Sequence, residues 1–244
     1  MANMAKTIFS IALLLIMLSL GVSGAVVRTG DSGAADPFDV FVYGIAALKE
    51  SADGRIRASG TMEIKEGKYS GKSRFYIETS AGGYCAFGDG TEILNDGKYN
   101  YIIDSGSKEV TVTDFDMESR SVLSNPLSVL FELPQGFSVK KRTWQGSGES
   151  RCYAVELVPA GDETGLSYLT LYVLPDGTGL AGLELGIVQG GESRDGSRRQ
   201  TSVTVDMDDF SMSVSGVFSA RGFTPDLEAL EMEGYFINDL RSGF

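Results

Sequence analysis

Apolar and polar side chains alternate with a period of two residues along most of the chain after residue 55. Met62 and Ile64 alternate with Glu63 and Lys65, which is the pattern of a strand that buries one face. Short strands at this spacing indicate an antiparallel sheet that curls into a sandwich or barrel. Beyond the first strand, the same signal predicts strands at 75–79, 82–87, 99–103, 109–113, 137–144, 151–158, 167–174, 181–188 and 201–207.

Two segments depart from this alternation and are predicted to be helical. Asp36 is a favourable N-cap before Pro37, and apolar residues then recur at three- and four-residue spacing up to residue 50, as on one face of an amphipathic helix. Pro126 opens the second segment, 127–133, and Pro134 closes it, because proline cannot continue a helix.

One face of the predicted strands is apolar along its whole length. The opposite face carries polar residues such as Glu156, Glu184 and Asp206, so the apolar face must be covered. Two interpretations stay open: the two helices fill this face as an ordinary core, or they leave an apolar cavity for a ligand. The residues predicted to line such a cavity are Met62, Ile64, Phe75, Ile77, Tyr99, Tyr101, Tyr153, Val155, Leu157, Leu169, Leu171, Val173, Leu183, Leu185, Ile187, Val203 and Val205.

Composition limits the chemistry that the chain can perform. The formal net charge is −12 and no basic stripe is present, which argues against binding to nucleic acid. The 244 residues include no histidine, which removes Ser-His and Cys-His catalytic pairs and ordinary zinc sites. The acidic segments at 88–90 and 206–209 lack the spacing of a calcium loop. We therefore expect no enzymatic activity, no metal and no cofactor.

The first 24 residues have the pattern of an export signal. Lys6 supplies a positive start, residues 8–20 are uncharged and mostly aliphatic, and small residues permit cleavage between Gly24 and Ala25. An uncleaved anchor is the alternative, but the apolar run is shorter than the roughly 20 residues that cross a bilayer. We expect a flexible lead-in over 25–36 and a single domain over 37–244.

Two cysteines lie on predicted strands far apart in the sequence, at Cys85 and Cys152. An exported compartment permits a disulfide between them, but a bridge requires Cα atoms within about 7 Å of each other. The sequence leaves a disulfide and two buried free thiols both open.

The hairpin predicted at 95–113 resembles part of a known family. An Asn-Asp-Gly turn leads into Tyr99–Ile103, and a second turn at 104–107 returns the chain into Glu109–Thr113. This stretch resembles the "SDGK…W…VTV" hairpin of the LolA family of periplasmic lipoprotein carriers. The ending GYFINDLR at 234–241 is similar to a "YPG…VIDLR" ending in that family, and the order of elements agrees over about residues 37–241.

The resemblance implies a mostly β fold: a curved antiparallel sheet, or incomplete β-barrel, covered by helices. It also implies a monomeric periplasmic carrier that shields the acyl chains of lipoproteins. An ATP-driven inner-membrane complex would release each lipoprotein to it, and an outer-membrane acceptor would receive the cargo. The alternative is a sensing or scaffold module that binds a lipid or an outer-membrane protein without shuttling it, and a plain structural domain with a filled core comes third. The expected lid residues are Phe38, Phe41, Ile45, Leu127 and Leu130.

The chain departs from the family at one functional position. In the better-known carriers an arginine after the second strand holds the lid closed, and the matching region here, Ile64–Gly67, contains none. Arg74 lies a strand away, while Tyr101 takes the place of the family's tryptophan. Lid closure therefore either works differently here, or the chain has the fold without the carrier function.

Overall fold

The structure is a computed structural model, and from Pro37 onward its described residues form one compact unit. The predicted export signal lies outside the described residues. Within the part of the chain that is described, no helix is long and apolar enough to cross a membrane. The described residues are 35–115, 125–161, 165–192, 198–214 and 222–242.

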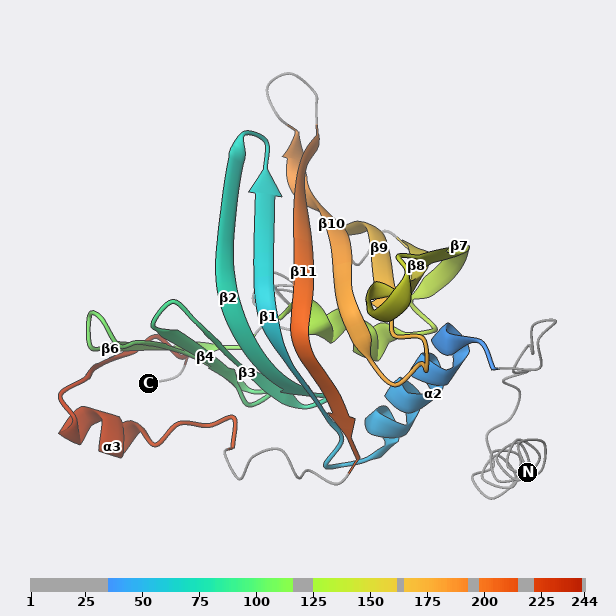
Figure 1. Cartoon of the computed structure of the whole chain (residues 1–244). Coiled ribbons are helices and arrows are strands. Elements are labelled where there is room, and N and C mark those ends of the chain that lie inside the picture. The colour runs from blue at the N-terminus through green and yellow to red at the C-terminus, as the bar shows by residue number, and fades with distance from the viewer. Residues whose placement is uncertain (1–34, 116–124, 162–164, 193–197, 215–221, 243–244) are drawn as a thin grey trace. The chain divides into compact units, whose positions relative to one another are not determined.

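A single open sheet of 12 strands makes up most of the unit, in the order β12-β6-β5-β4-β3-β2-β1-β11-β10-β9-β8-β7 (Figure 1). All neighbouring strands are antiparallel except β12 and β6, which are parallel. The predicted mostly β class and curved antiparallel sheet are confirmed. The strands are β1 Arg55–Glu66, β2 Tyr69–Ser80, β3 Gly83–Gly88, β4 Thr91–Asn95, β5 Tyr99–Asp104, β6 Glu109–Asp114, β7 Phe137–Gln145, β8 Cys152–Pro159, β9 Leu166–Val173, β10 Leu180–Glu192, β11 Arg198–Ser213 and β12 Phe236–Asp239.

The centre of the sheet is a long-range pairing between β1 and β11. The two strands pair from Arg55 opposite Ser213 to Glu66 opposite Thr201, so β11 is longer at both ends than predicted. A bulge interrupts the register at Gly60. A Cβ added at Gly60 would lie 2.0 Å from the carbonyl oxygen of Asp206, so only glycine allows the two backbones to approach this closely.

Two helical segments, which we call the lid, cover one face of the sheet. The α-helix α2 spans Pro37–Glu50, as predicted. The second segment is a 3-10 helix, η2, over Pro126–Glu132, and proline at its first turn and after its end keeps it short. The short helices η3, Gly148–Ser150, and α3, Leu227–Met232, were not predicted.

The sheet buries apolar residues on both faces, which the one-sided pattern did not indicate. The face under the lid, here called the lid face, carries Ile77 of β2 within the larger hydrophobic cluster. The neighbouring residue Glu78 points to the opposite face and pairs with Cys85, which belongs to a second cluster formed by β3–β6. The C-terminal segment, residues 222–242, covers that second cluster with Phe223, Leu227, Leu230, Tyr235 and Ile237.

Glu78 is a charged residue of β2 and is buried, at 1 % exposure. Arg55 Nη1 lies 2.6 Å from Glu78 Oε1, and the Arg55 guanidinium stacks over the ring of Phe223 at 4.9 Å. Tyr76 donates a hydrogen bond from its hydroxyl to the other carboxylate oxygen at 3.3 Å. The C-terminal segment thus helps to cover a buried ion pair.

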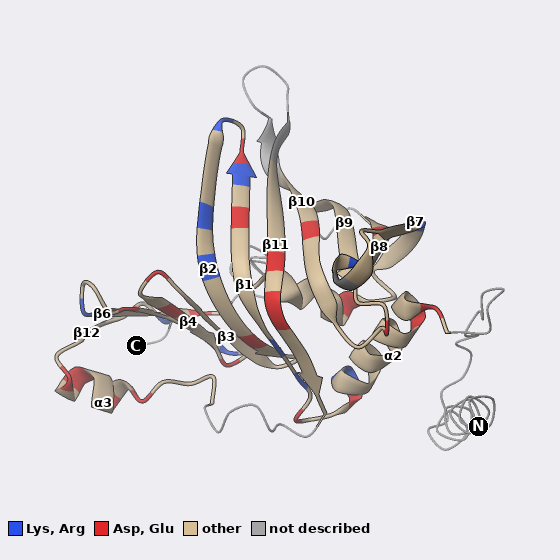
Figure 2. Ribbon diagram, in the orientation of Figure 1, with Lys and Arg blue, Asp and Glu red and all other residues tan. Residues whose placement is uncertain are grey.

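Beyond the reach of that segment, the face opposite the lid is charged. Acidic and basic residues follow β1, β2, β10 and β11 (Figure 2). Arg74 of β2 pairs with Asp208 of β11 at 2.6 Å, and both side chains are exposed. Arg74 therefore lies on the face away from the lid and does not replace the family's lid arginine.

No disulfide joins Cys85 and Cys152. Cys85 is on β3 and Cys152 is on β8, with β2, β1, β11, β10 and β9 between them. Burial raises the pKa of the Cys152 thiol, which reduces its reactive thiolate fraction. The structure therefore has two separate thiols, of which Cys85 is buried, as expected for the alternative to a disulfide, and Cys152 is only half-buried.

Candidate functional site

The side chains predicted to form a cavity and a lid meet each other on the lid face of β8–β11. Phe41, Ile45, Leu127 and Leu130 of the lid are fully buried and belong to the same cluster as the strand residues beneath them. Met62, Ile64, Tyr153 and Ile187 are partly buried at its margin. In this structure the lid residues pack directly into this cluster. The fully buried or nearly buried strand members are Phe75, Ile77, Val155, Leu157, Leu169, Leu171, Val173, Leu183, Leu185, Val203 and Val205.

The structure places Tyr99 and Tyr101 elsewhere. Tyr101 pairs with Leu94 on one side and Val112 on the other, and all three belong to the second cluster on the opposite face of the sheet. Tyr99 packs against the same cluster. Because successive strand residues point to opposite faces, their neighbours Asn100 and Ile102 are the ones that face the lid side.

A pocket of about 540 Å³ lies on the lid face where the lid stops covering the sheet. Its floor comes from β3–β5, whose directly paired residues point to the same face: Tyr84 opposite Asn95, and Ile93 opposite Ile102. Lys49 of α2 and Glu132 of η2 also line it. The apolar part of the wall is Ala81, Tyr84, Ile93, Ile102, Phe115 and Phe131.

Phe131 connects the pocket to the core under the lid. Its side chain is 8 % exposed, belongs to the large cluster and lines the pocket. Ile102 is 42 % exposed, so the pocket reaches solvent on its other side. A volume of this size is within the range of small-molecule sites, about 300–1,000 Å³.

Polar groups form the rest of the pocket wall. Asn95 donates from Nδ2 to Asn100 Oδ1 at 2.7 Å and accepts from the backbone N–H of Gly97 at 3.0 Å. Asn125 donates from Nδ2 to Thr79 Oγ1 at 3.0 Å. Within the described residues, no group of three or more His, Cys, Asp or Glu side chains could hold a metal ion.

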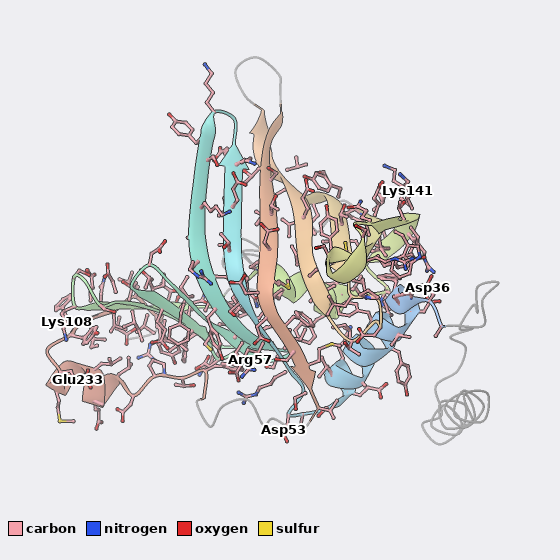
Figure 3. The ribbon with its side chains drawn as sticks, viewed as in Figure 1. Asp36, Asp53, Arg57, Lys108, Lys141 and Glu233 are labelled. Carbon is pink, nitrogen blue, oxygen red and sulfur yellow. The ribbon has the colours of Figure 1, made fainter. Side chains whose placement is uncertain are left out.

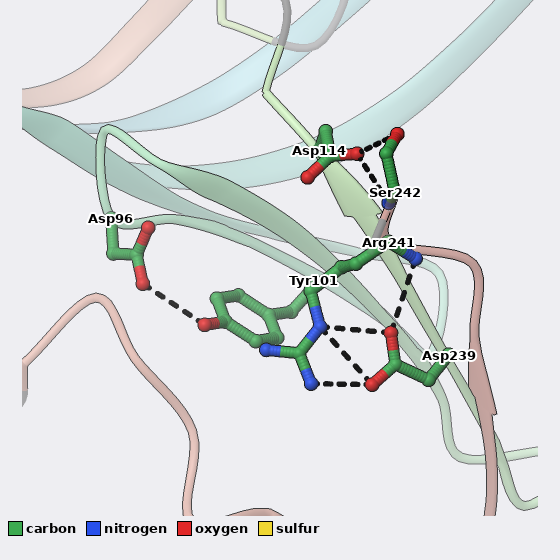
Figure 4. A network of polar contacts seen from close by, with 6 residues as sticks. All are labelled: Asp96, Tyr101, Asp114, Asp239, Arg241 and Ser242. Carbon is green, nitrogen blue, oxygen red and sulfur yellow. Dashed lines mark hydrogen bonds and ion pairs between the residues drawn. The ribbon is translucent and has the colours of Figure 1, made fainter. Parts of the chain in front are cut away.

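The Asn-Asp-Gly turn that resembles the carrier family forms one rim of the pocket. Asp96 accepts hydrogen bonds from the backbone N–H groups of Lys98 and Tyr99, at 2.9 and 2.7 Å, and from the Tyr101 hydroxyl at 2.9 Å (Figure 4). Burial alone would raise the pKa of Asp96, but these bonds together with one from Thr224 lower it. Burial, followed by the bond to Asp96, raises the pKa of Tyr101 to about 12.

The C-terminal segment is fastened beside this turn. Arg241 pairs with Asp239, and Ser242 donates from its backbone N–H to Asp114 at 2.7 Å (Figure 4). At the other end of the hairpin, Lys108 Nζ donates to the carbonyl oxygen of Glu233 at 3.4 Å (Figure 3). These contacts hold the hairpin behind the pocket at both of its ends.

The first turn of α2 is tied to the edge strand β7. Arg142 Nη2 donates to Asp39 Oδ1 at 3.1 Å, and the Arg142 guanidinium lies 5.4 Å from the centre of the Phe38 ring. Both charged side chains are partly exposed. This arginine comes from a different strand than the one in the family's pattern.

Sequence reasoning missed most residues of the pocket. Ile93 and Ile102 each stand beside a second apolar residue, Leu94 and Ile103. Such pairs are the signal of a strand that is apolar on both faces. Asn125, in the sequence, indicates only the start of a helical segment.

No protein-family model and no protein of curated function matches the sequence. Solved structures are similar to this chain. A domain assigned to outer membrane lipoprotein sorting from Vibrio parahaemolyticus is 10 % identical, with a TM-score of 0.37, and the match covers 78 % of this chain and 97 % of that domain. A LolA superfamily protein from Nitrosomonas europaea is 9 % identical with a TM-score of 0.36, covering 78 % and 98 %. An uncharacterized conserved protein from Thermus thermophilus is 7 % identical with a TM-score of 0.40, covering 82 % and 98 %.

Proposed function

We propose that this protein is a periplasmic carrier that hides the acyl chains of lipoproteins between its curved sheet and its lid, and moves them from the inner to the outer membrane. An acyl chain cannot cross water unshielded, because each exposed methylene costs about 0.8 kcal/mol. The observation that supports the proposal is the pocket of about 540 Å³, which opens to solvent at one end and adjoins the core under the lid at the other.

Loading would begin at the pocket and continue under the lid. The apolar wall around Ile93 and Ile102 accepts the end of a chain, and Phe131 separates that wall from the lid core. Displacement of the lid would then expose Leu171 and Leu185, which are fully buried in the same cluster in this structure. The lid core refills when the cargo leaves, so binding is reversible.

The burial of the lid core favours a second candidate function. A lid that stays closed over Leu171 and Leu185 leaves only the pocket for a ligand. Such a protein would act as a sensing or scaffold module that binds a lipid without shuttling it. Transfer of the ligand to an acceptor membrane distinguishes the carrier from this module.

Native mass spectrometry of the protein purified gently from the periplasm tests the proposal, together with titration of a synthetic lipopeptide. We expect a co-purifying or added acylated ligand, and we expect Ile102→Lys to abolish its binding. Val158→Lys is the matched control, because Val158 is a strand residue of similar exposure, 41 %, on β8 and outside the pocket lining. A ligand-free mass in the presence of excess lipopeptide would refute both candidate functions.

A further inference from the structure

One polar atom at the pocket lacks a partner. Asn125 is 3 % exposed and lines the pocket. Its Nδ2 donates to Thr79 Oγ1 at 3.0 Å, whereas its Oδ1 is buried with no hydrogen-bond partner in the described part of the chain. A buried acceptor without a donor is costly, and native proteins leave few of them.

The surrounding hydrogen bonds determine which amide atom is left over. The Thr79 hydroxyl has one proton, which it directs to the carbonyl oxygen of Ser80 at 3.4 Å. It therefore receives the amide group of Asn125 as an acceptor. The atom without a partner is the carbonyl oxygen, so the missing group is a hydrogen-bond donor.

The charges at the pocket indicate that this donor is neutral. Among the described residues, Lys49 and Glu132, one of each sign, line the pocket, so this part of the wall supplies no net charge that would offset a buried ammonium or carboxylate. Burying an unpaired ion is strongly unfavourable. An ionised fatty acid also carries no donor at its head.

We infer that the pocket selects acyl ligands whose head carries a neutral N–H or O–H group, and that Asn125 Oδ1 accepts a hydrogen bond from it. This inference rests on the proposed function, because it assigns a head-group preference to the same pocket. An amide-linked acyl chain fits the requirement, and an ester-linked chain with no N–H or O–H does not. Thr79 acts as a positioning residue, since it holds the amide of Asn125 in this orientation.

A pair of ligands that differ in one atom tests the inference. N-palmitoylglycine methyl ester carries an amide N–H, and its analogue with oxygen in place of that N–H is otherwise the same. Calorimetric titration of the full chain should show about two- to tenfold tighter binding of the amide, the effect of one hydrogen bond. N-methylation of the amide should remove this advantage. Hexadecanol compared with its methyl ether tests the hydroxyl form of the donor.

Two variants assign the preference to Asn125. In Asn125→Leu the amide and the ester should bind equally, and Thr79→Val should reduce the preference even if the first variant folds poorly. Thr170→Val, a polar-to-apolar change on β9 outside the pocket lining, should keep the full preference. Equal binding of both ligands to the wild-type protein, or a preference retained in Asn125→Leu, would overturn the inference and leave the proposed function standing. If neither ligand binds, the proposed function fails with it.

Discussion

The buried pair of Arg55 and Glu78 leads to a quantitative prediction about stability. The two side chains are 20 % and 2 % exposed, and their charged atoms are 2.6 Å apart. Replacing Arg55 by leucine leaves the Glu78 carboxylate buried without its cation, and such a loss costs about 3–5 kcal/mol. Because Arg55 keeps some exposure, we expect the lower end, about 3 kcal/mol, or a fall in Tm of about 6–12 °C for a chain of this size.

The matched control is an ion pair of the same length on the surface. Arg74 and Asp208 are also 2.6 Å apart, but their side chains are 80 % and 60 % exposed. Arg74→Leu should therefore cost no more than about 1 kcal/mol. The free energy of unfolding is measured in urea for both variants. Equal losses from Arg55→Leu and Arg74→Leu would refute the reasoning, because burial would then make no difference.

A second variant separates the ion pair from its surroundings. In Arg55→Leu/Glu78→Leu no charge is left buried alone, and replacing a whole buried pair by apolar residues is often neutral or stabilising. The double variant should therefore recover most of the lost stability. A loss in the double variant equal to that in Arg55→Leu would mean that the stacking of Arg55 on Phe223, at 4.9 Å, dominates.

Four further predictions concern the lid, the sheet and the hairpin. Arg142→Ala removes the ion pair with Asp39. We expect the free energy of unfolding to fall by about 0.2–1 kcal/mol and the backbone amides of residues 38–42 to exchange faster. Unchanged exchange there would show that this ion pair does not hold the lid. Leu185→Glu places a charge at a fully buried position. If the lid opens over this residue, the variant should still fold but should no longer take up ligand. If circular dichroism shows instead that the variant is unfolded, Leu185 is a core residue only. Asp96 has a lowered pKa in the folded state, so its contribution to stability is present above about pH 4 and is lost as the pH falls through the folded-state pKa. In Asp96→Asn, the free energy of unfolding should therefore fall less steeply as the pH is lowered. The Tyr101 pKa of about 12 in the folded protein acts in the opposite direction: its contribution to stability is complete below about pH 10 and is lost between about pH 10 and 12. Tyr101→Phe should remove this loss of stability at alkaline pH. An unchanged dependence of stability on pH would contradict the assignment.

The parts of the fold that depend on local sequence could be predicted. Helix α2 begins at Pro37 and ends at Glu50 because a cap, a proline and an apolar stripe are all encoded within a few residues. The hairpin of β5 and β6 follows from its two turns in the same way. The open, curved antiparallel sheet was predicted from the spacing of such strands and from the resemblance together.

The pocket could not be predicted in this way, because it depends on where distant segments end. Alternation identifies one apolar face, but Ile93-Leu94 and Ile102-Ile103 belong to strands with two. Which member of each pair faces the lid depends on the register with β3 and β6. The other face is buried only because residues 222–242 return to cover it. Sequence reasoning therefore placed the cavity under the lid, whereas the pocket described above lies beside η2, over β3–β5.

The order of the strands also has a consequence for how the chain folds. Strands β1–β6 and β7–β11 are two meanders whose neighbours in the sheet are also neighbours in the sequence. Only the pairing of β1 with β11 joins the meanders within the sheet, and it must close a loop that contains nearly all of the other strands. Contacts of such long sequence separation form late, because the entropy of loop closure opposes them. We therefore expect the hairpins within each meander to form before β1 pairs with β11 and before residues 222–242 pack on β3–β6.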